Sequence, residues 1–299
     1  MNDSNIPPAD QLIKPLVTAF FDEQTNTYSY IVQDPLSKAC AIVDPVLNFD
    51  YPSGTTSYEG ADAIIAAVKQ QGLQTEWIIE THAHADHLSA APYIKQALGG
   101  KIAIGEKITT VQKTFGKLFN DGPGFARDGS QFDYLFKENE TYKIGHLTAT
   151  ALYTPGHTPA CMSHIIGDAI FVGDTIFMPD GGTARADFPG GDAAELYRSI
   201  HKILSLPGNY RIFVCHDYAP NDREYACETT VADQLKHNIH VKEGISLEKF
   251  VSMRRARDKT LGMPRLILPS LQVNIRAGNM PEPEDNGLVY LKLPVNAFK

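Results

Sequence analysis

The stretch 81–87, with the sequence THAHADH, places His82, His84, Asp86 and His87 within seven residues. It directly follows an apolar run and directly precedes a segment with helical character, so it is predicted to be a loop at the end of a strand. Loops at strand ends are where binding sites are usually built. Neutral imidazole is a common metal ligand, and a carboxylate beside it suits zinc or iron. The stretch therefore predicts a metal site, and the rest of the chain should supply the missing ligands.

Three further candidate ligands follow predicted strands downstream. His157 lies at the tip of a Pro-Gly turn, Asp174 follows a short apolar strand, and His216 follows the strand 211–214. Each motif alone is weak, because a lone histidine after a strand is usually a satisfied polar side chain. Together with the histidine-rich stretch they strengthen the prediction, since each offers a ligand at the same end of a strand.

The candidate ligands permit two metal arrangements. In the first, two metals about 3.5–4 Å apart generate a hydroxide nucleophile for hydrolysis. One metal would take His82, His84, His157 and Asp174, and the other would take Asp86, His87, His216 and a bridging Asp174. In the second, two histidines and one carboxylate hold a single metal and leave coordination positions open, as in non-haem Fe(II) oxygenases. The same residues therefore permit a hydrolase or a dioxygenase.

Predicted strands and helices follow one another in mixed order in both halves of the chain. Strands over 16–21, 28–32 and 39–43 should form an antiparallel meander that stops at Asp44. Asp44 could support the site or merely form the turn before the following proline. The order predicts an α/β fold in which two mixed sheets pack face to face with helices outside. A helix is expected to begin at Leu88, directly after the histidine-rich stretch.

The C-terminal part of the chain shows no change in composition that would mark a second domain. We therefore predict one domain over 1–299, with 229–299 as its extension, first helical and then irregular from Pro264. The basic run 253–259 is typical of a solvated helix face. The Gly- and Asp-rich segment 120–131 is predicted to be a surface loop, either facing solvent or covering the site.

Charge and hydropathy limit the partners. The net charge of -8 gives no sign of nucleic-acid binding, for which a basic patch is expected. No run of about 20 apolar residues predicts a transmembrane helix. The N-terminus lacks the basic and apolar regions of a secretory signal, and residues 1–8 are expected to be a disordered lead-in. These features predict a cytoplasmic enzyme that acts on a small molecule, without membrane or nucleic-acid partners.

The four cysteines form no Cys-x-x-Cys pair and are predicted to be reduced, structural thiols. Cys215 directly precedes His216. If that stretch is a regular strand, alternation points the Cys215 side chain away from the histidine.

The order of these ligands resembles the metallo-β-lactamase superfamily. The match comprises the pattern H-x-H-x-D-H at 82–87, followed by His157, Asp174 and His216 in the superfamily's order. The resemblance implies an αβ/βα sandwich with the metal site at one edge of the two sheets.

A narrower resemblance comes from motifs further along the chain. They are TARADFPGG at 183–191, LYRSIH at 196–201, HDY at 216–218 and GNMP at 278–281. These motifs look like the persulfide dioxygenase, or sulfur dioxygenase, branch that includes the ethylmalonic encephalopathy protein. They are most similar to its bacterial β-lactamase-hydrolase-like subgroup.

Membership of this branch would imply one Fe(II) per chain, bound by His82, His157 and Asp174. It would leave the second metal position empty, with four side chains lining the pocket instead: His84, Asp86, His87 and His216. The branch oxidises glutathione persulfide with O2 to sulfite and glutathione. Membership of the branch also implies a homodimer.

The resemblance implies that Arg185 and Tyr218 lie near the glutathione. A guanidinium fork suits a glutathione carboxylate. Alternatively, Arg185 could pair with Asp187 and brace its loop, and Tyr218 could serve packing.

The chain departs from the branch at three places: Ala186 stands where relatives often carry Cys or Thr, the loop 106–138 is long, and 266–276 looks like an extension. One alternative is a two-zinc thioester hydrolase of glyoxalase II type, which the motif at 183–191 and the shape of the tail disfavour. Another is a regulatory protein that keeps a metal without turnover.

Overall fold

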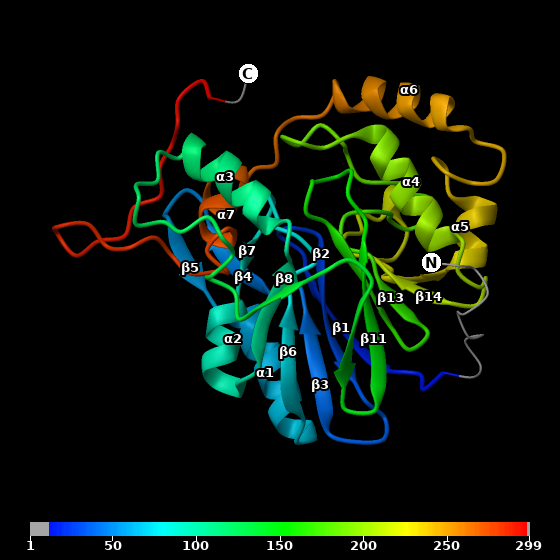
Figure 1. The fold of residues 1–299 in the computed structure, drawn as a ribbon, viewed down its shortest axis with the longest axis horizontal. Coiled ribbons are helices and arrows are strands. Elements are labelled where there is room, and N and C mark those ends of the chain that lie inside the picture. The colour runs from blue at the N-terminus through cyan, green and yellow to red at the C-terminus, as the bar shows by residue number, and fades with distance from the viewer. Residues whose placement is uncertain (1–11, 298–299) are drawn as a thin grey trace.

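The computed structural model describes residues 12–297, so the predicted lead-in at 1–8 lies outside it. Two six-stranded sheets pack face to face, with helices on their outer faces (Figure 1). In spatial order, the first sheet contains β1 (Leu16–Asp22), β2 (Thr27–Gln33), β3 (Ala39–Val43), β6 (Gln74–Ile79), β8 (Lys101–Gly105) and β9 (Tyr134–Phe136). The second contains β10 (Glu140–Ile144), β11 (Leu147–Tyr153), β12 (Met162–Ile166), β13 (Ala169–Phe171), β14 (Arg211–Phe213) and β15 (Glu228–Thr230). The predicted α/β sandwich is confirmed.

A small third sheet and the helices complete the fold. The third sheet has the order β5 (Thr55–Ser57), β4 (Val46–Asp50) and β7 (Leu88–Ser89). The helices are α1 (Glu59–Gln71), α2 (Ala91–Leu98), α3 (Ile108–Leu118), α4 (Ala193–Leu204), α5 (Val231–His237), α6 (Leu247–Asp258) and α7 (Ile267–Asn274), with a short 3-10 helix, η2 (Pro220–Asp222). None of the helices between residues 12 and 297 has the length and hydropathy needed to cross a bilayer.

Alternation along the strands divides the apolar side chains among three buried clusters. On β2, Tyr30 faces the second sheet, whereas the next residue, Ile31, packs with the cluster that includes α1, α2 and α3. On β14, Phe213 faces the first sheet and Ile212 packs against α4. Each fully buried side chain of this kind stabilises the folded state by about 1.5–3 kcal/mol. Because successive side chains on a strand point to opposite faces, each sheet packs against the other sheet on one face and against helices on the other.

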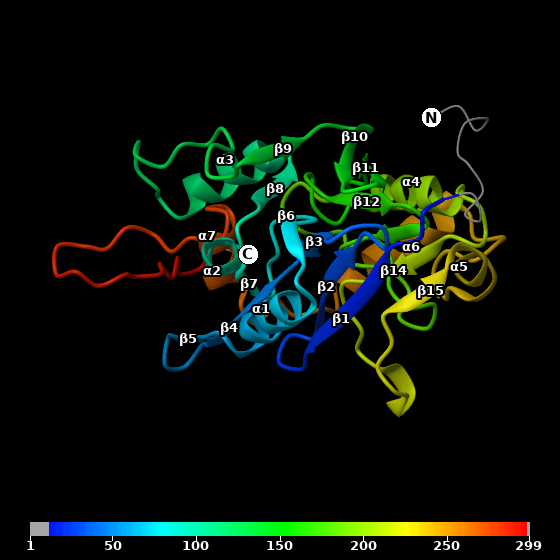
Figure 2. The same cartoon turned by 90° about the horizontal axis from the view of Figure 1, so that it is seen from below.

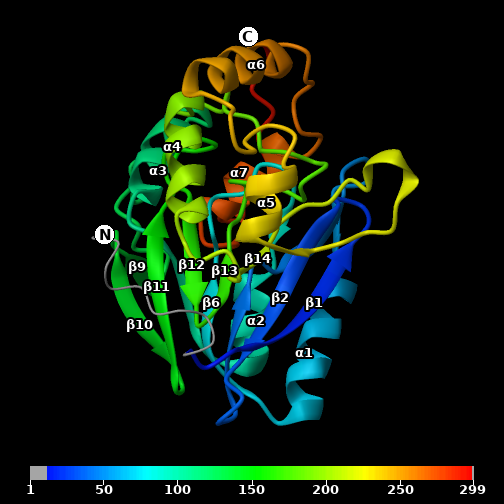
Figure 3. The same cartoon turned by 90° about the vertical axis from the view of Figure 1, so that its right-hand side faces the viewer.

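Parallel strand pairs bring the candidate ligands to one end of the sandwich. β3 and β6 are parallel neighbours, so the residues that follow them, Asp44 and the loop 80–87, meet at one edge. β13 and β14 are also parallel, which brings Asp174 close to His216. A bridge between Thr27 and His216 joins the two sheets at this end. Helix α6 lies across the same end of the molecule (Figures 1 and 3).

The helix predicted to begin at Leu88 begins three residues later. Leu88 and Ser89 instead form β7, which pairs with β4. α2 starts at Ala91, so Pro92 lies in its first turn. A helix starting at Leu88 would place this proline in the helix interior, where it removes a hydrogen bond and clashes with the preceding turn.

The tail predicted to be irregular from Pro264 contains the buried helix α7. Its only proline, Pro269, lies in the first turn, where it is tolerated. Seven of its eight residues are buried, and the polar ones among them find hydrogen-bond partners in the interior, as Gln272 and Asn274 do. After α7 the chain extends away from the sandwich as an arm, coloured red in Figure 2. That 1–299 form one domain stays a prediction.

The basic run 253–259 is not wholly solvated. Arg254, on α6, is 1% exposed and pairs with Asp258 one turn later, at 2.9 Å. The prediction of a solvated face was therefore wrong for Arg254, because a buried guanidinium is tolerated where a carboxylate satisfies it.

The loop 120–131 packs against the C-terminal tail. Lys292 donates to the carbonyl oxygens of Phe119 and Asn120, at 2.8 and 3.1 Å. Arg276 pairs with Asp121 at 2.8 Å, and its guanidinium lies over the ring of Phe125. The loop is thus a surface loop tied to the tail rather than to the cavity described below.

Asp34 joins turns of the two sheets at the end opposite the site. Its buried carboxylate accepts hydrogen bonds from the backbone nitrogen and Nδ1 of His146, each at 2.8 Å. Leu36 and Ser37 donate to the same carboxylate. Burial by itself raises the pKa of Asp34, but these hydrogen bonds outweigh it and hold the pKa well below its ordinary value.

We expect Asp34→Asn to lower the free energy of unfolding by about 1–3 kcal/mol at pH 7, because charged hydrogen bonds are lost. A carboxylate whose pKa is lowered by folding stabilises the folded state at pH values above its unfolded pKa of about 4. This stabilisation is lost as the pH falls below that value. The difference in the free energy of unfolding between Asp34→Asn and wild type should therefore shrink below about pH 4. Urea unfolding at pH 7, 5 and 3.5 measures it, with the exposed Asp285→Asn as control. An equal loss at all three pH values would contradict the electrostatic origin.

Candidate metal centre

The carboxylate of Asp44 shapes the histidine-rich loop. Asp44 follows β3 with a left-handed backbone (φ 48°) and is 2% exposed. It accepts hydrogen bonds from the backbone nitrogen of Thr81 at 2.7 Å, from Thr81 Oγ1 at 2.8 Å and from His84 Nε2 at 3.0 Å. Asp44 thus both turns the chain before the proline and supports the site, so the two alternatives left by the sequence hold together.

His82, His157 and Asp174 form one compact group, with ligand atoms within 4.8 Å of one another. Thr81 Oγ1 donates to Asp44 and so accepts from His82 Nδ1 at 3.0 Å, which leaves the buried His82 Nε2 without a partner. His157 Nδ1 donates to the carbonyl oxygen of Arg185 at 2.8 Å. Its Nε2 lies 3.7 Å from Asp174 Oδ2. Each imidazole is thus oriented by one nitrogen and offers the other, as metal-binding histidines do.

The remaining candidate ligands line the same centre. His87 Nδ1 donates to the carbonyl oxygen of Leu88. His216 Nε2 lies 3.2 Å from both Asp86 Oδ2 and Asp174 Oδ1. Several buried atoms among the described residues have no hydrogen-bond partner: His82 Nε2, His84 Nδ1, Asp86 Oδ2, His87 Nε2, Asp174 Oδ1 and His216 Nε2. Because buried polar groups are normally satisfied, this set fits a bound metal.

The protonation states differ among the histidines. Burial lowers the pKa of His82, and repulsion by His84 and His157 lowers it further. Burial, reinforced by His84, also lowers the pKa of His87 to about 3. For His84 burial alone would lower the pKa, but Asp44 and its other hydrogen-bond partners outweigh burial and raise it. His82 and His87 are therefore neutral near pH 7, the form that binds a metal.

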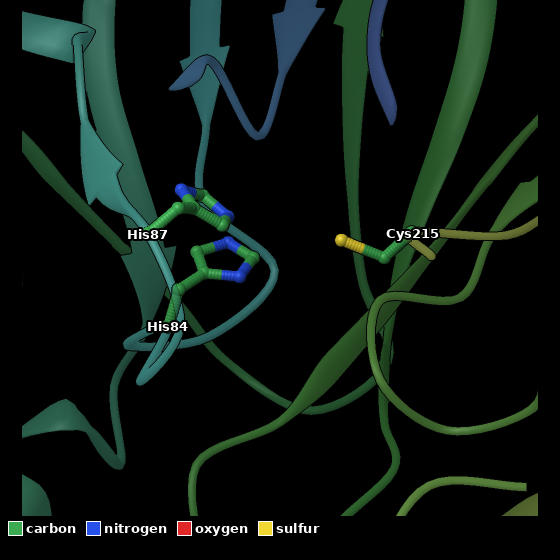
Figure 4. Close-up of side chains that lie close together, drawn as sticks. All are labelled: His84, His87 and Cys215. Atoms are coloured by element: carbon green, nitrogen blue, oxygen red, sulfur yellow. The ribbon is translucent and has the colours of Figure 1, made fainter. Parts of the chain in front are cut away.

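Cys215 points toward the centre, contrary to the prediction. Its Sγ belongs to a group with Asp174 and His216, and to another with His84 and His87, again within 4.8 Å. Figure 4 shows the sulfur directed toward the imidazoles of His84 and His87. β14 ends at Phe213, so the alternation of a regular strand does not apply to Cys215. Burial raises the pKa of this thiol, which keeps it protonated.

A cavity of about 390 Å³ opens onto the centre and is lined by Asp86, His157 and Asp174. Arg185 and Tyr218 line it as well. The Arg185 side chain pairs with both carboxylate oxygens of Asp187, at 2.6 and 2.8 Å, which is the bracing alternative raised by the sequence. The Tyr218 ring stacks on His216 with 6.0 Å between centroids. Substrate contacts of Arg185 and Tyr218 stay predictions.

Two glycines allow other parts of the chain to pack closely against the backbone beside two candidate ligands. A Cβ on Gly156 would lie 2.2 Å from the backbone nitrogen of Leu196 in α4, and a Cβ on Gly173 would lie 2.5 Å from Thr81 Oγ1. Both glycines have positive φ, at 133° and 50°. Glycine is required where the backbone is left-handed and crowded. This accounts for the glycines that directly precede His157 and Asp174.

Asn274, at the end of α7, contacts the histidine-rich loop and was missed in the sequence. Its amide nitrogen donates to the carbonyl oxygens of His84 and His87, both at 2.8 Å. Its amide oxygen accepts from the backbone nitrogen of Ser89 at 2.9 Å. No local pattern in the tail signals this role, because the partners lie about 190 positions away in the chain.

The chain is similar to known metallo-β-lactamase-like proteins. A family profile described as the metallo-beta-lactamase superfamily matches residues 23–216. The chain is 55% identical to a Burkholderia pseudomallei protein named "Probable metallo-hydrolase", over 94% of this chain and 99% of that protein. It is 51% identical to a beta-lactamase hydrolase-like protein of Xylella fastidiosa, over 95% of this chain but 66% of that longer protein. It is 49% identical to Glyoxylase B2 of Dictyostelium discoideum, over 96% of this chain and 99% of that protein.

Similarity to named persulfide dioxygenases is lower but extends over most of the chain. The chain is 28% identical to Persulfide dioxygenase ETHE1 of Bos taurus, over 90% of this chain and 91% of that protein. The crystal structure of ETHE1 from Myxococcus xanthus matches with a TM-score of 0.70 and 25% identity, covering 88% of this chain and all of the other. The predicted resemblances to the superfamily and to β-lactamase-hydrolase-like proteins are confirmed.

We expect Asn274→Ala to lower the free energy of unfolding by about 3 kcal/mol or more, because three buried backbone groups lose their partners. Metal affinity should fall about 10–100-fold, as for other groups that orient metal ligands. Urea unfolding and competitive metal titration measure the two effects. The exposed Asn279→Ala, which loses one bond to the carbonyl oxygen of Arg276, is the control. Wild-type values for both quantities in Asn274→Ala would contradict this role.

Proposed function

The chain belongs to the metallo-β-lactamase superfamily, and we propose that it is an Fe(II)-dependent persulfide dioxygenase. The observation that carries the proposal is the compact group of His82, His157 and Asp174. Two histidines and one carboxylate are the ligand set of non-haem Fe(II) oxygenases. Among residues 12–297, no fourth histidine, cysteine or carboxylate joins this group at the same spacing.

Fe(II) held by these three residues would supply redox chemistry with O2, because such a triad leaves coordination positions open. His216 Nε2 lies 3.2 Å from Asp174 Oδ1, and the proposal places this imidazole in the pocket beside the iron ligand rather than on a second metal. His84 is already engaged by Asp44 through Nε2. The proposal gives these side chains the role of orienting the ligands and enclosing the site.

The proposed substrate is glutathione persulfide. One persulfide, one O2 and one water give glutathione, sulfite and two protons, and the outer sulfur loses the four electrons that reduce O2. The similarity to ETHE1 in both sequence and fold supports this reaction. The cavity of about 390 Å³ falls within the range of small-molecule sites, about 300–1,000 Å³.

A two-metal thioester hydrolase of glyoxalase II type is the second candidate. The unpartnered atoms His84 Nδ1, His87 Nε2 and Asp86 Oδ2 favour it, since they could bind a second metal. The names of two relatives, a metallo-hydrolase and Glyoxylase B2, point the same way. In this case two zinc ions would activate water.

A cytoplasmic location and a homodimer remain part of the dioxygenase proposal.

Metal content and oxygen uptake distinguish the two candidates. The protein is purified anaerobically, iron and zinc are counted per chain, and glutathione persulfide is then added in an oxygen electrode. A dioxygenase should contain about one iron and consume about one O2 per sulfite formed. Two zinc ions, no oxygen uptake and cleavage of S-lactoylglutathione would reject the dioxygenase proposal.

Two substitutions test the ligand assignment. Asp174→Ala should abolish metal binding and activity in either enzyme, because Asp174 is a ligand in both arrangements. His216→Ala should leave iron bound in a dioxygenase, but it should remove one of two metals and most activity from a hydrolase. Metal analysis of both variants measures this, with the exposed His237→Ala as control. Loss of all iron from His216→Ala would contradict the assignment.

A further inference from the structure

Arg223 joins two loops that line the cavity of the candidate metal centre. Its guanidinium pairs with both carboxylate oxygens of Asp180, through Nε at 2.6 Å and through Nη2 at 2.8 Å. It also pairs with both oxygens of Asp217, through Nη1 at 2.6 Å and through Nη2 at 2.7 Å. A planar guanidinium that binds two carboxylates in this way fixes their relative positions, which the single ammonium group of a lysine does not do.

Asp180 lies at the turn of a tight hairpin, residues 176–183, which the rest of the protein holds in place. The buried amide of Gln234 donates to the carbonyl oxygen of Phe177 at 2.7 Å. Asn238, which is also buried, donates to a carbonyl oxygen on the opposite side of the hairpin at 3.1 Å. The hairpin is therefore a fixed anchor, and Phe177 on it lines the cavity.

The second loop, residues 217–226, protrudes from the sandwich and is yellow in Figures 2 and 3. Three of its residues have a left-handed backbone although none is a glycine: Ala219, Asn221 and Asp222, with φ of 43°, 60° and 57°. Asparagine and aspartate tolerate this conformation, but the Cβ of alanine makes it unfavourable. A strained backbone persists only where the surrounding contacts enforce it.

The buried carboxylate of Asp217 supplies these contacts. Its Oδ1 accepts a hydrogen bond from the backbone nitrogen of Ala219 at 3.3 Å, and its Oδ2 accepts one from the backbone nitrogen of Ala226 at 2.8 Å. The two ends of the loop thus meet on one carboxylate, whose charge Arg223 neutralises. Without the guanidinium this carboxylate would be a buried anion with no cation beside it, which is costly. Arg223 therefore both closes the loop and ties it to the hairpin.

Tyr218 depends on this loop, because it directly precedes the strained Ala219. Its side chain is 58% exposed, yet its ring stacks on His216 and lies edge-on to the ring of Phe177, with 6.1 Å between the centroids. Tyr218 and Phe177 both line the cavity. An exposed side chain on a protruding loop changes rotamer rapidly unless its surroundings fix it. Here the tie between the loop and the hairpin holds the two rings together.

We propose that Arg223 is a positioning residue that fixes Phe177 and Tyr218 as one aromatic wall of the cavity. The inference rests on the proposed function, since it assumes that the substrate occupies this cavity. Arg223 acts on substrate binding and not on the metal centre. His216, directly before the loop, is held independently, because its Nδ1 donates to the carbonyl oxygen of Asn26 at 3.1 Å.

The kinetic test uses Arg223→Gln and Arg223→Lys in the iron-loaded, full-length protein, with oxygen uptake measured against glutathione persulfide concentration. We expect KM to rise about tenfold in Arg223→Gln, with kcat and iron content nearly unchanged, because the wall is misplaced while the metal centre is intact. Arg223→Lys should give an intermediate KM, because lysine keeps the charge but not the paired hydrogen bonds. The matched control is Arg198→Gln, which removes an exposed ion pair with Glu195 on α4, away from the cavity, and should show wild-type kinetics.

Cleavage by chymotrypsin gives a second readout that depends on no reaction of the protein. Tyr218 and Tyr225 are exposed aromatic residues of the loop, so their cleavage rate reports how often the loop opens. This rate should rise about tenfold in Arg223→Gln and stay at the wild-type value in Arg198→Gln. Cleavage at the exposed Tyr51, which lies outside both loops, should be unchanged in every variant and serves as the internal control.

The outcomes separate this inference from the proposed reaction. If S-lactoylglutathione is cleaved and no persulfide is oxidised, the dioxygenase proposal fails, and a tenfold rise in KM for the thioester supports the role of Arg223. If Arg223→Gln oxidises glutathione persulfide with a wild-type KM, the dioxygenase stands and the inference is overturned. Loss of iron, a fall in kcat at unchanged KM, or cleavage of the loop at the wild-type rate would also overturn it. If Arg223→Gln does not fold, Arg223→Lys decides by the same criteria.

Discussion

The buried carboxylate of Asp44 is the interaction on which the metal centre depends. It lies at the junction of two parallel strands, β3 and β6, and accepts three hydrogen bonds from the loop that follows β6. These bonds fix the backbone at Thr81 and the ring of His84. Through Thr81 Oγ1 they also orient His82. A buried carboxylate is costly unless its oxygens are satisfied, so the loop and Asp44 stabilise each other.

Distant parts of the chain complete this arrangement. Asn274 of α7 ties down the carbonyl oxygens of the same loop, and His216 links the second sheet to the first through its bridge with Thr27. Gly156 lets α4 approach the turn that carries His157. The nitrogens of the candidate ligands are therefore oriented before any metal binds, which lowers the cost of binding.

Charge is distributed unevenly along the cavity. Carboxylates and histidines gather at its inner end, where the metal is proposed to bind. Four guanidinium groups, those of Arg185, Arg254, Arg257 and Arg265, line the same cavity. Two of them, Arg185 and Arg254, are engaged by Asp187 and Asp258.

Local patterns in the sequence were enough to predict the sandwich, its alternating strands and the candidate ligands at the strand ends. These features depend on local periodicity and on short motifs, and both are visible within a few residues. Other features depend on contacts between distant parts of the chain. These are the start of α2, the burial of α7 and of Arg254, and the direction of the Cys215 side chain. The contact of Asn274 and the pairing of Arg185 with Asp187 in place of an open guanidinium were likewise decided only by the tertiary structure. Each of these depends on which groups from distant positions meet, and the energy of a buried polar contact is set by its partner rather than by its neighbours in the chain.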